Sequence, residues 1–209
     1  MSIKGLFVTG TDTEIGKTIT STILTLGLNG SYWKPIQSGL EEETDSEFIS
    51  QFIDKDRVLP EAYSLNKPLS PHLSAKIDNI NIDFDSIKLP SKIKGPLIVE
   101  GAGGIHVPLN DKYFIIDIIK KFGLPTVITA RSGLGTINHT LLTLEALRKR
   151  DISVLGVVMV GTKNFPNKEA IEKYGETSVL MEVEPIDKFT IENFKAIYDN
   201  SELAKKLLY

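Results

Sequence analysis

The segment from Gly10 to Thr18 has the residue types and the spacing needed to hold a polyphosphate. Its glycines let backbone N–H groups turn toward phosphate oxygens, Lys17 is placed to reach the β and γ phosphates, and the Thr18 hydroxyl is placed to bind Mg²⁺. An apolar run at residues 5–9 precedes the segment and a helical period follows it, so a helix N-terminus would add a favourable field. Five residues separate Gly10 from Gly16, whereas the common motif has four, so the loop is a variant. The alternative is a Gly-Lys-Thr sequence that only caps the helix, and the strand-loop-helix context favours nucleotide binding.

Two acidic residues are candidates for holding a divalent ion beside that loop. Glu100 ends the apolar run 96–100 and is followed by Gly-Ala-Gly-Gly, so a ligand can approach it closely. Ligands of open α/β sheets bind at the carboxyl ends of the strands, which favours Glu100 as a Mg²⁺ ligand, directly or through water. The alternative is a strand-end carboxylate that only accepts hydrogen bonds from loop N–H groups. Asp45, taken alone, is best explained as a first-turn residue that complements a helix dipole.

Lys34 follows the second predicted strand, in the sequence Lys-Pro-Ile-Gln-Ser-Gly. There it would stabilise an anion at the same sheet edge, with Ser38 as a hydrogen-bond donor. A surface lysine before a proline turn explains these residues equally well. His72, His106 and His139 show no metal-ligand spacing, so we expect them to be polar or loop residues.

Short β-rich apolar runs alternate with segments of helical period, which predicts parallel strands joined by crossover helices. Several runs are apolar at successive positions, as in a sheet covered on both faces. We therefore expect a three-layer α/β fold, a P-loop NTPase-like parallel sheet with helices on both faces, in a single domain over residues 1–209. The expected strands are residues 5–9, 32–34, 96–100, 125–130, 154–160 and a less pronounced run at 178–181. The expected helices are residues 16–28, 45–52, 113–122, 136–150, 168–174, 191–198 and 202–208, and residues 54–94 are expected to be loop with short helices.

The composition excludes several classes of protein. The 209 residues include 24 Lys and Arg and 27 Asp and Glu, so the net charge is -3. The chain therefore lacks the basic excess that a nucleic-acid binder usually has. There is no cysteine, which removes disulfides, thiolate nucleophiles and Cys-based metal sites. The longest apolar run, 154–160, is far shorter than the ~20 residues of a membrane-spanning helix. We expect a cytoplasmic protein with no nucleic-acid or membrane partner.

Taken together, these motifs resemble the dethiobiotin synthetases, the ATP-dependent carboxylases and cyclo-ligases of biotin biosynthesis. The five-residue spacing in the loop is the form found in that family, and the resemblance runs from residue 5 to about residue 140. The shared residues are the loop 10–18, Lys34-Pro35 with Ser38-Gly39, Asp45, Ser70-Pro71-His72, Glu100-Gly101-Ala102-Gly103-Gly104, and Gly135-x-Ile137-Asn138-His139.

The resemblance implies that 7,8-diaminononanoate, CO₂ and MgATP are converted to dethiobiotin, ADP and phosphate through a carbamate and a carbamic-phosphoric anhydride. It also implies a homodimer with the substrate site at the subunit interface. By motif position, the implied catalytic residues are Lys34, Lys17 and Thr13, and the implied substrate-binding residues are Ser38, Thr136, Ile137 and Asn138. The nucleotide would be held by Glu14, Ile15, Gly16, Lys17, Thr18, Ile19, Asp45, Glu100, Gly101, Ala102 and Gly103, and Mg²⁺ by Thr18, Asp45 and Glu100.

The chain departs from the family pattern after the run 154–160. Family members that use adenine carry Asn-Asp there, whereas this chain has Val160-Gly161-Thr162, so ATP is the expected nucleotide by default, with backbone or Asn164 contacting the base. Two alternatives have other functions: a nucleotide-switch ATPase of the partitioning or metal-insertion type, and a nucleotide-binding module without activity. Switch ATPases carry a lysine early in the loop, and residues 10–14 contain none.

Overall fold

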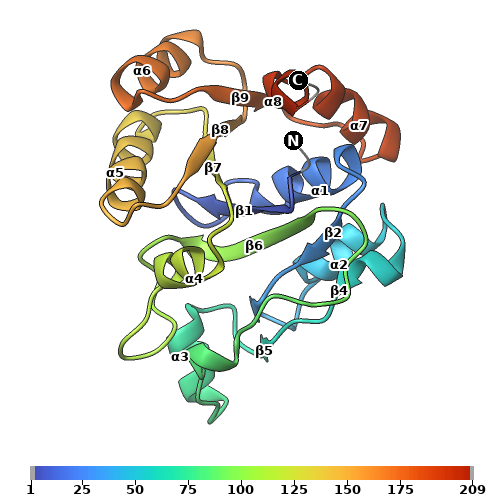
Figure 1. Ribbon diagram of the computed structural model, residues 1–209, viewed down its shortest axis with the longest axis vertical. Helices are drawn as coiled ribbons and strands as arrows, with labels where there is room; N and C mark the ends of the chain where they lie inside the picture. The colour runs from blue at the N-terminus through green and yellow to red at the C-terminus, as the bar shows by residue number, and fades with distance from the viewer. Residues whose placement is uncertain (1–2, 208–209) are drawn as a thin grey trace.

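Seven parallel strands form the central sheet of the computed structural model, which describes residues 3–207 (Figure 1). The strand order is β4-β2-β6-β1-β7-β8-β9, and every neighbouring pair is parallel. β1 lies inside the sheet, between β6 and β7, so the phosphate-loop segment leaves the middle of the sheet at its carboxyl edge. The strands are β1 (Gly5–Gly10), β2 (Ser31–Trp33), β4 (Val58–Leu59), β6 (Leu97–Gly104), β7 (Thr126–Arg131), β8 (Val154–Val160) and β9 (Val179–Val183).

Helices cover both faces of the sheet, which makes the fold a three-layer α/β architecture (Figure 1). One face packs against α4, α5 and α6, and the other against α1, α7 and α8. The helices are α1 (Lys17–Gly27), α2 (Asp45–Ser50), α3 (Pro71–Ile77), α4 (Ile115–Phe122), α5 (Thr136–Arg148), α6 (Phe165–Gly175), α7 (Ile191–Asp199) and α8 (Glu202–Leu207). Within the described residues, no helix is long and apolar enough to cross a membrane.

The core is divided by the sheet into two clusters. Successive residues of β1 point to opposite faces, so Phe7 joins the cluster under α4 and α5, while Leu6 and Val8 join the cluster under α1 and α7. This explains the continuous apolar runs, because each strand has no solvent-facing side.

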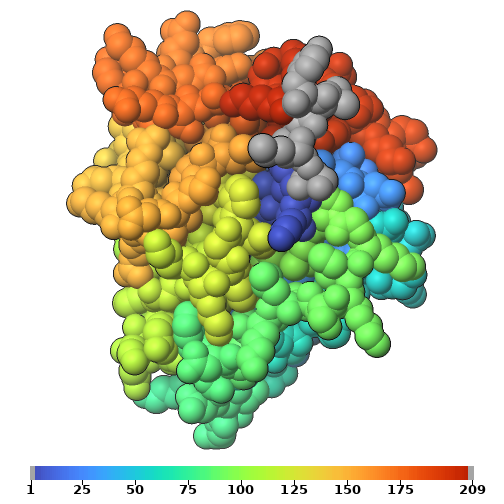
Figure 2. Space-filling model, in the orientation of Figure 1, coloured from blue at the N-terminus to red at the C-terminus, as the bar shows by residue number. Residues whose placement is uncertain are grey.

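Residues 54–94 contain more regular structure than the sequence predicted. β4 adds an edge to the main sheet, and β3 (Ile36–Ser38) pairs with β5 (Tyr63–Leu65) in a separate two-stranded parallel sheet. These strands have only two or three residues each. β4 lies at the side of the molecule beside β2, while the part of the segment around β5 and α3 forms the end opposite α6 and α8 (Figure 1, Figure 2).

The other differences lie at element boundaries. All six expected strands are present, but β2 ends at Trp33, so Lys34 lies just beyond it. α6 begins at Phe165, three residues before the expected start at Lys168, because Asn164 caps it by accepting a hydrogen bond from the Asn167 N–H at 3.1 Å. Leu208, the last residue of the expected final helix, lies outside the described residues.

Gly27 marks the closest approach between α1 and α7, and we expect Gly27→Ala to destabilise the protein. A Cβ there would lie 2.1 Å from Cγ of Tyr198. Alanine normally favours a helix over glycine by ~1 kcal/mol, but overpacking costs about 1–3 kcal/mol, so the net change should be a loss.

Urea unfolding measures this loss. Gly133→Ala is the matched control, because no atom lies within 4 Å of a Cβ built at Gly133. Equal stability of the Gly27→Ala variant and the unsubstituted protein would contradict the described packing of α1 on α7.

Candidate active site

The loop between β1 and α1 owes its shape to glycine. Gly16 precedes Lys17, the first residue of α1, and has a φ of 89°, in the left-handed region. A Cβ at Gly16 would also lie 2.9 Å from Cγ1 of Val160, at the end of β8. Both the backbone angle and the available space therefore favour glycine immediately before α1.

Two basic side chains hold this loop through Asp12. The Lys17 ammonium donates a hydrogen bond to the Asp12 carbonyl oxygen at 2.9 Å. The Arg131 guanidinium, at the end of β7, pairs with the Asp12 carboxylate at 2.5 Å, and the Thr13 N–H donates to the same carboxylate at 2.8 Å. Burial lowers the pKa of Lys17, although the charge of Glu100 opposes this shift.

Lys34 and Glu100 meet because their strands are neighbours. β2 pairs with β6 so that Trp33 lies opposite Val99, and these two residues are followed in the chain by Lys34, just beyond β2, and by Glu100 in β6. Both side chains are buried, with 6% and 1% of their surfaces exposed. The Lys34 ammonium forms an ion pair with Asp45 and lies 3.4 Å from Oε1 of Glu100.

Asp45 joins this cluster from the first turn of α2. Thr44 caps the helix in a capping box with Glu47, which fixes where α2 begins and so where Asp45 lies. The Thr18 hydroxyl hydrogen-bonds to the Asp45 carboxylate and lies 3.4 Å from Oε1 of Glu100. Asp45 is therefore a first-turn residue, as its sequence context predicts, and also a member of the buried cluster.

The charges of the cluster set the protonation of its members. Burial disfavours the Lys34 ammonium, but Glu100 and Asp45 outweigh burial and raise its pKa. Burial also disfavours the Asp45 carboxylate, yet the Lys34 charge and its hydrogen bond lower the pKa of Asp45. Burial raises the pKa of Glu100, with the Asp45 charge adding to the shift and Lys34 opposing it. The result is a lysine that stays protonated between two acidic side chains.

A cavity of about 600 Å³ opens beside this cluster and collects most of the predicted site residues. Its lining includes Thr13, Glu14, Ile15, Gly16, Lys17, Thr18, Lys34, Ser38, Asp45, Glu100, Ala102 and Gly103. Ile19 instead packs toward the core from α1, and Gly101 lies in β6 against the Phe7 ring, with a built Cβ 3.1 Å from that ring. Thr136, Ile137 and Asn138 form the start of α5, outside the lining of this cavity.

Comparison with known proteins identifies the family. A family model described as an AAA domain matches residues 4–193. The ATP-dependent dethiobiotin synthetase of Paramagnetospirillum magneticum is 48% identical over 188 residues, which cover 90% of this chain and 91% of the relative. The enzyme of the same name from Rhodopseudomonas palustris is 45% identical over 195 residues, 92% of each chain. The chain belongs to the dethiobiotin synthetase family.

Solved structures outside the dethiobiotin synthetases share the fold. A plasmid partition protein from Borrelia burgdorferi aligns with a TM-score of 0.52 and 12% identity, over 99% of this chain and 100% of that one. A ParA family ATPase from Chlorobium tepidum gives 0.50 and 10%, over 99% and 96%. At these identities the likeness shows the P-loop NTPase-like architecture and nothing about activity.

The oxygen atoms of the cluster fit Mg²⁺. The hydroxyl of Thr18 and the carboxylates of Asp45 and Glu100 converge on one region, and all are hard oxygen donors. Mg²⁺ is usually held by one or two carboxylates together with phosphate oxygens and water, so a polyphosphate on the loop would complete its ligand set.

Several residues of the cavity were not predicted from the sequence. Gln37 lines it beside Ser38, and the segment 68–71 closes it from the region expected to be irregular loop. Tyr32, which the sequence placed only in an expected strand, is buried and contacts Glu100 from outside the lining of the cavity. The available sequence signal for Gln37 was the run Lys-Pro-Ile-Gln-Ser-Gly. For residues 68–71 it was the two prolines of Pro-Leu-Ser-Pro.

The buried cluster predicts a large stability loss for Lys34→Met. Methionine keeps much of the side-chain volume but leaves the buried Glu100 and the partly buried Asp45 without their cation, and breaking a buried pair costs about 3–5 kcal/mol. Added Mg²⁺ should restore part of the loss, because it replaces the missing positive charge.

Thermal unfolding with and without Mg²⁺ tests this expectation. Lys67→Met is the control, because Lys67 pairs with Glu41 at an exposed position, where its loss should leave the midpoint unchanged. A Lys34→Met midpoint equal to that of the control would show that the described cluster does not stabilise the protein.

Proposed function

We propose that the protein carboxylates 7,8-diaminononanoate with CO₂ and closes the ureido ring at the expense of ATP, giving dethiobiotin, ADP and phosphate. One observation carries the proposal: the cavity beside the phosphate loop brings together Lys17, Lys34 and a set of oxygen atoms that fits Mg²⁺. The chain that forms this cavity is 48% identical to an enzyme named for this product. Residues 1–209 would act as one domain, in the cytoplasm.

The reaction proceeds in three steps. One substrate amine adds to CO₂ and loses a proton, which gives a carbamate. A carbamate oxygen then attacks the γ-phosphorus of ATP, ADP leaves, and a carbamic-phosphoric anhydride forms. The second amine attacks the carbonyl carbon of this anhydride and loses a proton, phosphate leaves, and the ring closes.

The protein's task is to let two anions meet. A carbamate and a triphosphate repel each other, and preorganised cations at their meeting point lower that barrier. Lys17 at the loop and Lys34 at the end of β2 line the same cavity, and the raised pKa of Lys34 keeps its ammonium charged. Thr18, Asp45 and Glu100 would hold Mg²⁺, which supplies further positive charge to the phosphates. Thr13 would lie beside the reacting groups and Ser38 would contact the substrate.

The nucleotide would rest on the loop 10–18, with Glu14, Ile15, Gly16 and Ile19 around its phosphates and residues 101–103 beside it. We propose ATP as the nucleotide. Asn164 uses its side-chain oxygen to cap α6, so its amide N–H₂ is the part left to contact a base.

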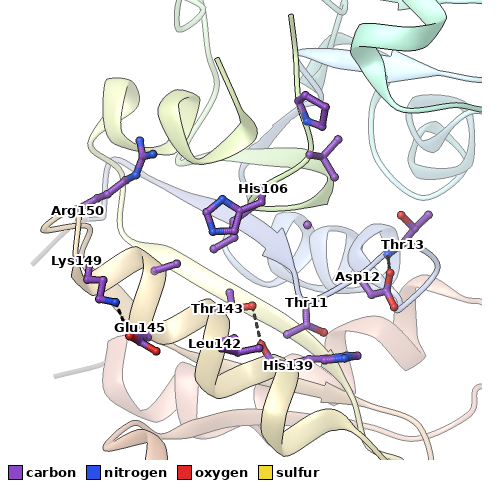
Figure 3. A pocket seen from close by; sticks show the side chains of 15 residues that line it. Thr11, Asp12, Thr13, His106, His139, Leu142, Thr143, Glu145, Lys149 and Arg150 are labelled. Atoms are coloured by element: carbon purple, nitrogen blue, oxygen red, sulfur yellow. Dashed lines mark hydrogen bonds and ion pairs between the residues drawn. The ribbon is translucent and has the colours of Figure 1, made fainter. Parts of the chain in front are cut away.

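A second copy of the chain would complete the substrate site. A groove of about 800 Å³ runs between α5 and the loop after β6, and Figure 3 shows His139, Leu142 and Thr143 on its α5 wall with Asp12 and Thr13 at one end. Leu142 in its wall is 55% exposed, and Leu134, two residues before α5, is fully exposed, which favours a covered surface. Covering this groove would bring the partner's α5 near the cavity, where Thr136, Ile137 and Asn138 would receive the substrate carboxylate.

Phosphate release with MgATP and bicarbonate, with and without the diamine, tests the activity. We expect release to depend on the diamine. Release without it would support the nucleotide-switch alternative, and nucleotide binding without release would support a module without activity.

Lys34→Met should lower diamine-dependent turnover by about 10²–10³-fold, because one preorganised cation is lost from the transition state. ADP should still bind, since Lys17 and the loop are intact. Turnover at the rate of the Lys67→Met control would show that Lys34 has no part in the reaction.

Leu134→Asp and Leu142→Asp should each shift the protein from dimer to monomer in sedimentation velocity, because a charge would be buried in the interface. Leu89→Asp is the control, at a 40% exposed leucine outside the groove. A dimer that withstands both substitutions, or a monomeric parent protein, would contradict the proposed interface.

A further inference from the structure

Tyr32 lies behind the active-site cluster and contacts one of its carboxylates. Its side chain is fully buried, and its hydroxyl donates a hydrogen bond to Oε2 of Glu100 at 3.1 Å. The phenol is the donor because an ionised carboxylate can only accept. The contact follows from the sheet: Tyr32 pairs with Ile98 on β6, and Glu100 is the next residue of β6 on the same face.

The two oxygens of Glu100 thus have different surroundings. Oε2 faces the Tyr32 hydroxyl, whereas Oε1 lies 3.4 Å from both the Lys34 ammonium and the Thr18 hydroxyl. The last torsion of a glutamate is broad, so a carboxylate without such a partner could turn its plane and point neither oxygen at the cations. The hydrogen bond from the Tyr32 hydroxyl favours the rotation of the carboxylate in which its other oxygen points toward the Lys34 ammonium and the Thr18 hydroxyl.

We propose that Tyr32 is a positioning residue that aims one oxygen of Glu100 at the metal site. The inference rests on the proposed function, in which Glu100 holds Mg²⁺ beside the phosphates. Partners that hold a metal ligand from behind orient it and tune its charge, and their loss typically costs about 10–100-fold in metal affinity or activity.

The alternative is that Tyr32 only satisfies a buried carboxylate. In that case its loss would lower stability and leave the metal affinity of the folded protein unchanged. The two roles therefore differ in a binding constant, and stability alone does not separate them.

Tyr32→Phe removes the hydroxyl and keeps the ring. We would titrate Mn²⁺ into the ADP complex of the folded protein and follow free metal by electron paramagnetic resonance. The expected result is a metal dissociation constant about 10–100-fold higher, with ADP affinity in the absence of metal unchanged. The Mg²⁺ concentration for half-maximal turnover should rise in parallel, while the KM for the diamine stays the same.

Tyr63→Phe is the matched control. The Tyr63 hydroxyl contacts the Ser86 hydroxyl and the Asp83 N–H, and none of these residues lines the cavity. This variant should bind metal as the unsubstituted protein does. A folded Tyr32→Phe protein with the metal affinity of this control overturns the proposal.

The proposed function and this inference fail in different ways. If the unsubstituted ADP complex binds metal but shows no diamine-dependent turnover, the function is wrong and the metal titration still decides the role of Tyr32. If that complex binds no metal, the Mg²⁺ assignment of Glu100 falls and the role of Tyr32 falls with it.

A second measurement remains decisive if Tyr32→Phe does not fold. The chain has six tyrosines, which can be labelled at the ring carbon bearing oxygen and observed by NMR. One signal that persists in Tyr63→Phe protein should shift as Mg²⁺ binds the ADP complex. If no tyrosine signal follows the metal, the proposal is overturned.

Discussion

The active site depends on two acidic side chains that lie close together with little exposure to water, and on one lysine whose positive charge offsets their repulsion. Asp45 and Glu100 are both acidic and both withdrawn from water, which is costly unless a cation shares the space. Lys34 meets that need, and it reaches both carboxylates because β2 and β6 are parallel neighbours that end at the same edge. The proposed chemistry uses the same positive charge. The charge that stabilises the carboxylates of the cavity would also stabilise a carbamate and a triphosphate.

Thr18 connects this charge cluster to the phosphate loop. It is the second residue of α1, so its position is set by the left-handed turn at Gly16. Its hydroxyl contacts Asp45 from α2 and approaches Glu100 from β6. Three elements that are distant in the sequence therefore meet at Thr18, and the start of α1 positions residues that would hold phosphates and a divalent ion.

The sequence predicted those parts of the molecule that depend on local pattern. The long apolar strands, the loop and Glu100 could be placed because a strand, a glycine-rich turn and a strand-end acid are adjacent in the chain. Lys34 and Asp45 were ambiguous on their own, since their partners lie 11 and 66 residues from Lys34 and no local signal pairs them. The short strands β3, β4 and β5 were not predicted, although β2, which is equally short, was. The role of Tyr32 was not predicted because its hydroxyl meets a residue 68 positions away in the sequence.

The ion pair between Arg131 and Asp12 connects the groove beside α5 with the phosphate loop between β1 and α1. Arg131 ends β7, and α5 begins at Thr136, so a short connection links the arginine to the helix that forms one wall of the groove. Asp12 lines the other end of the same groove, and its carbonyl oxygen accepts a hydrogen bond from the Lys17 ammonium. The groove beside α5 and the phosphate loop therefore share Asp12, which Arg131 and Lys17 hold from two sides.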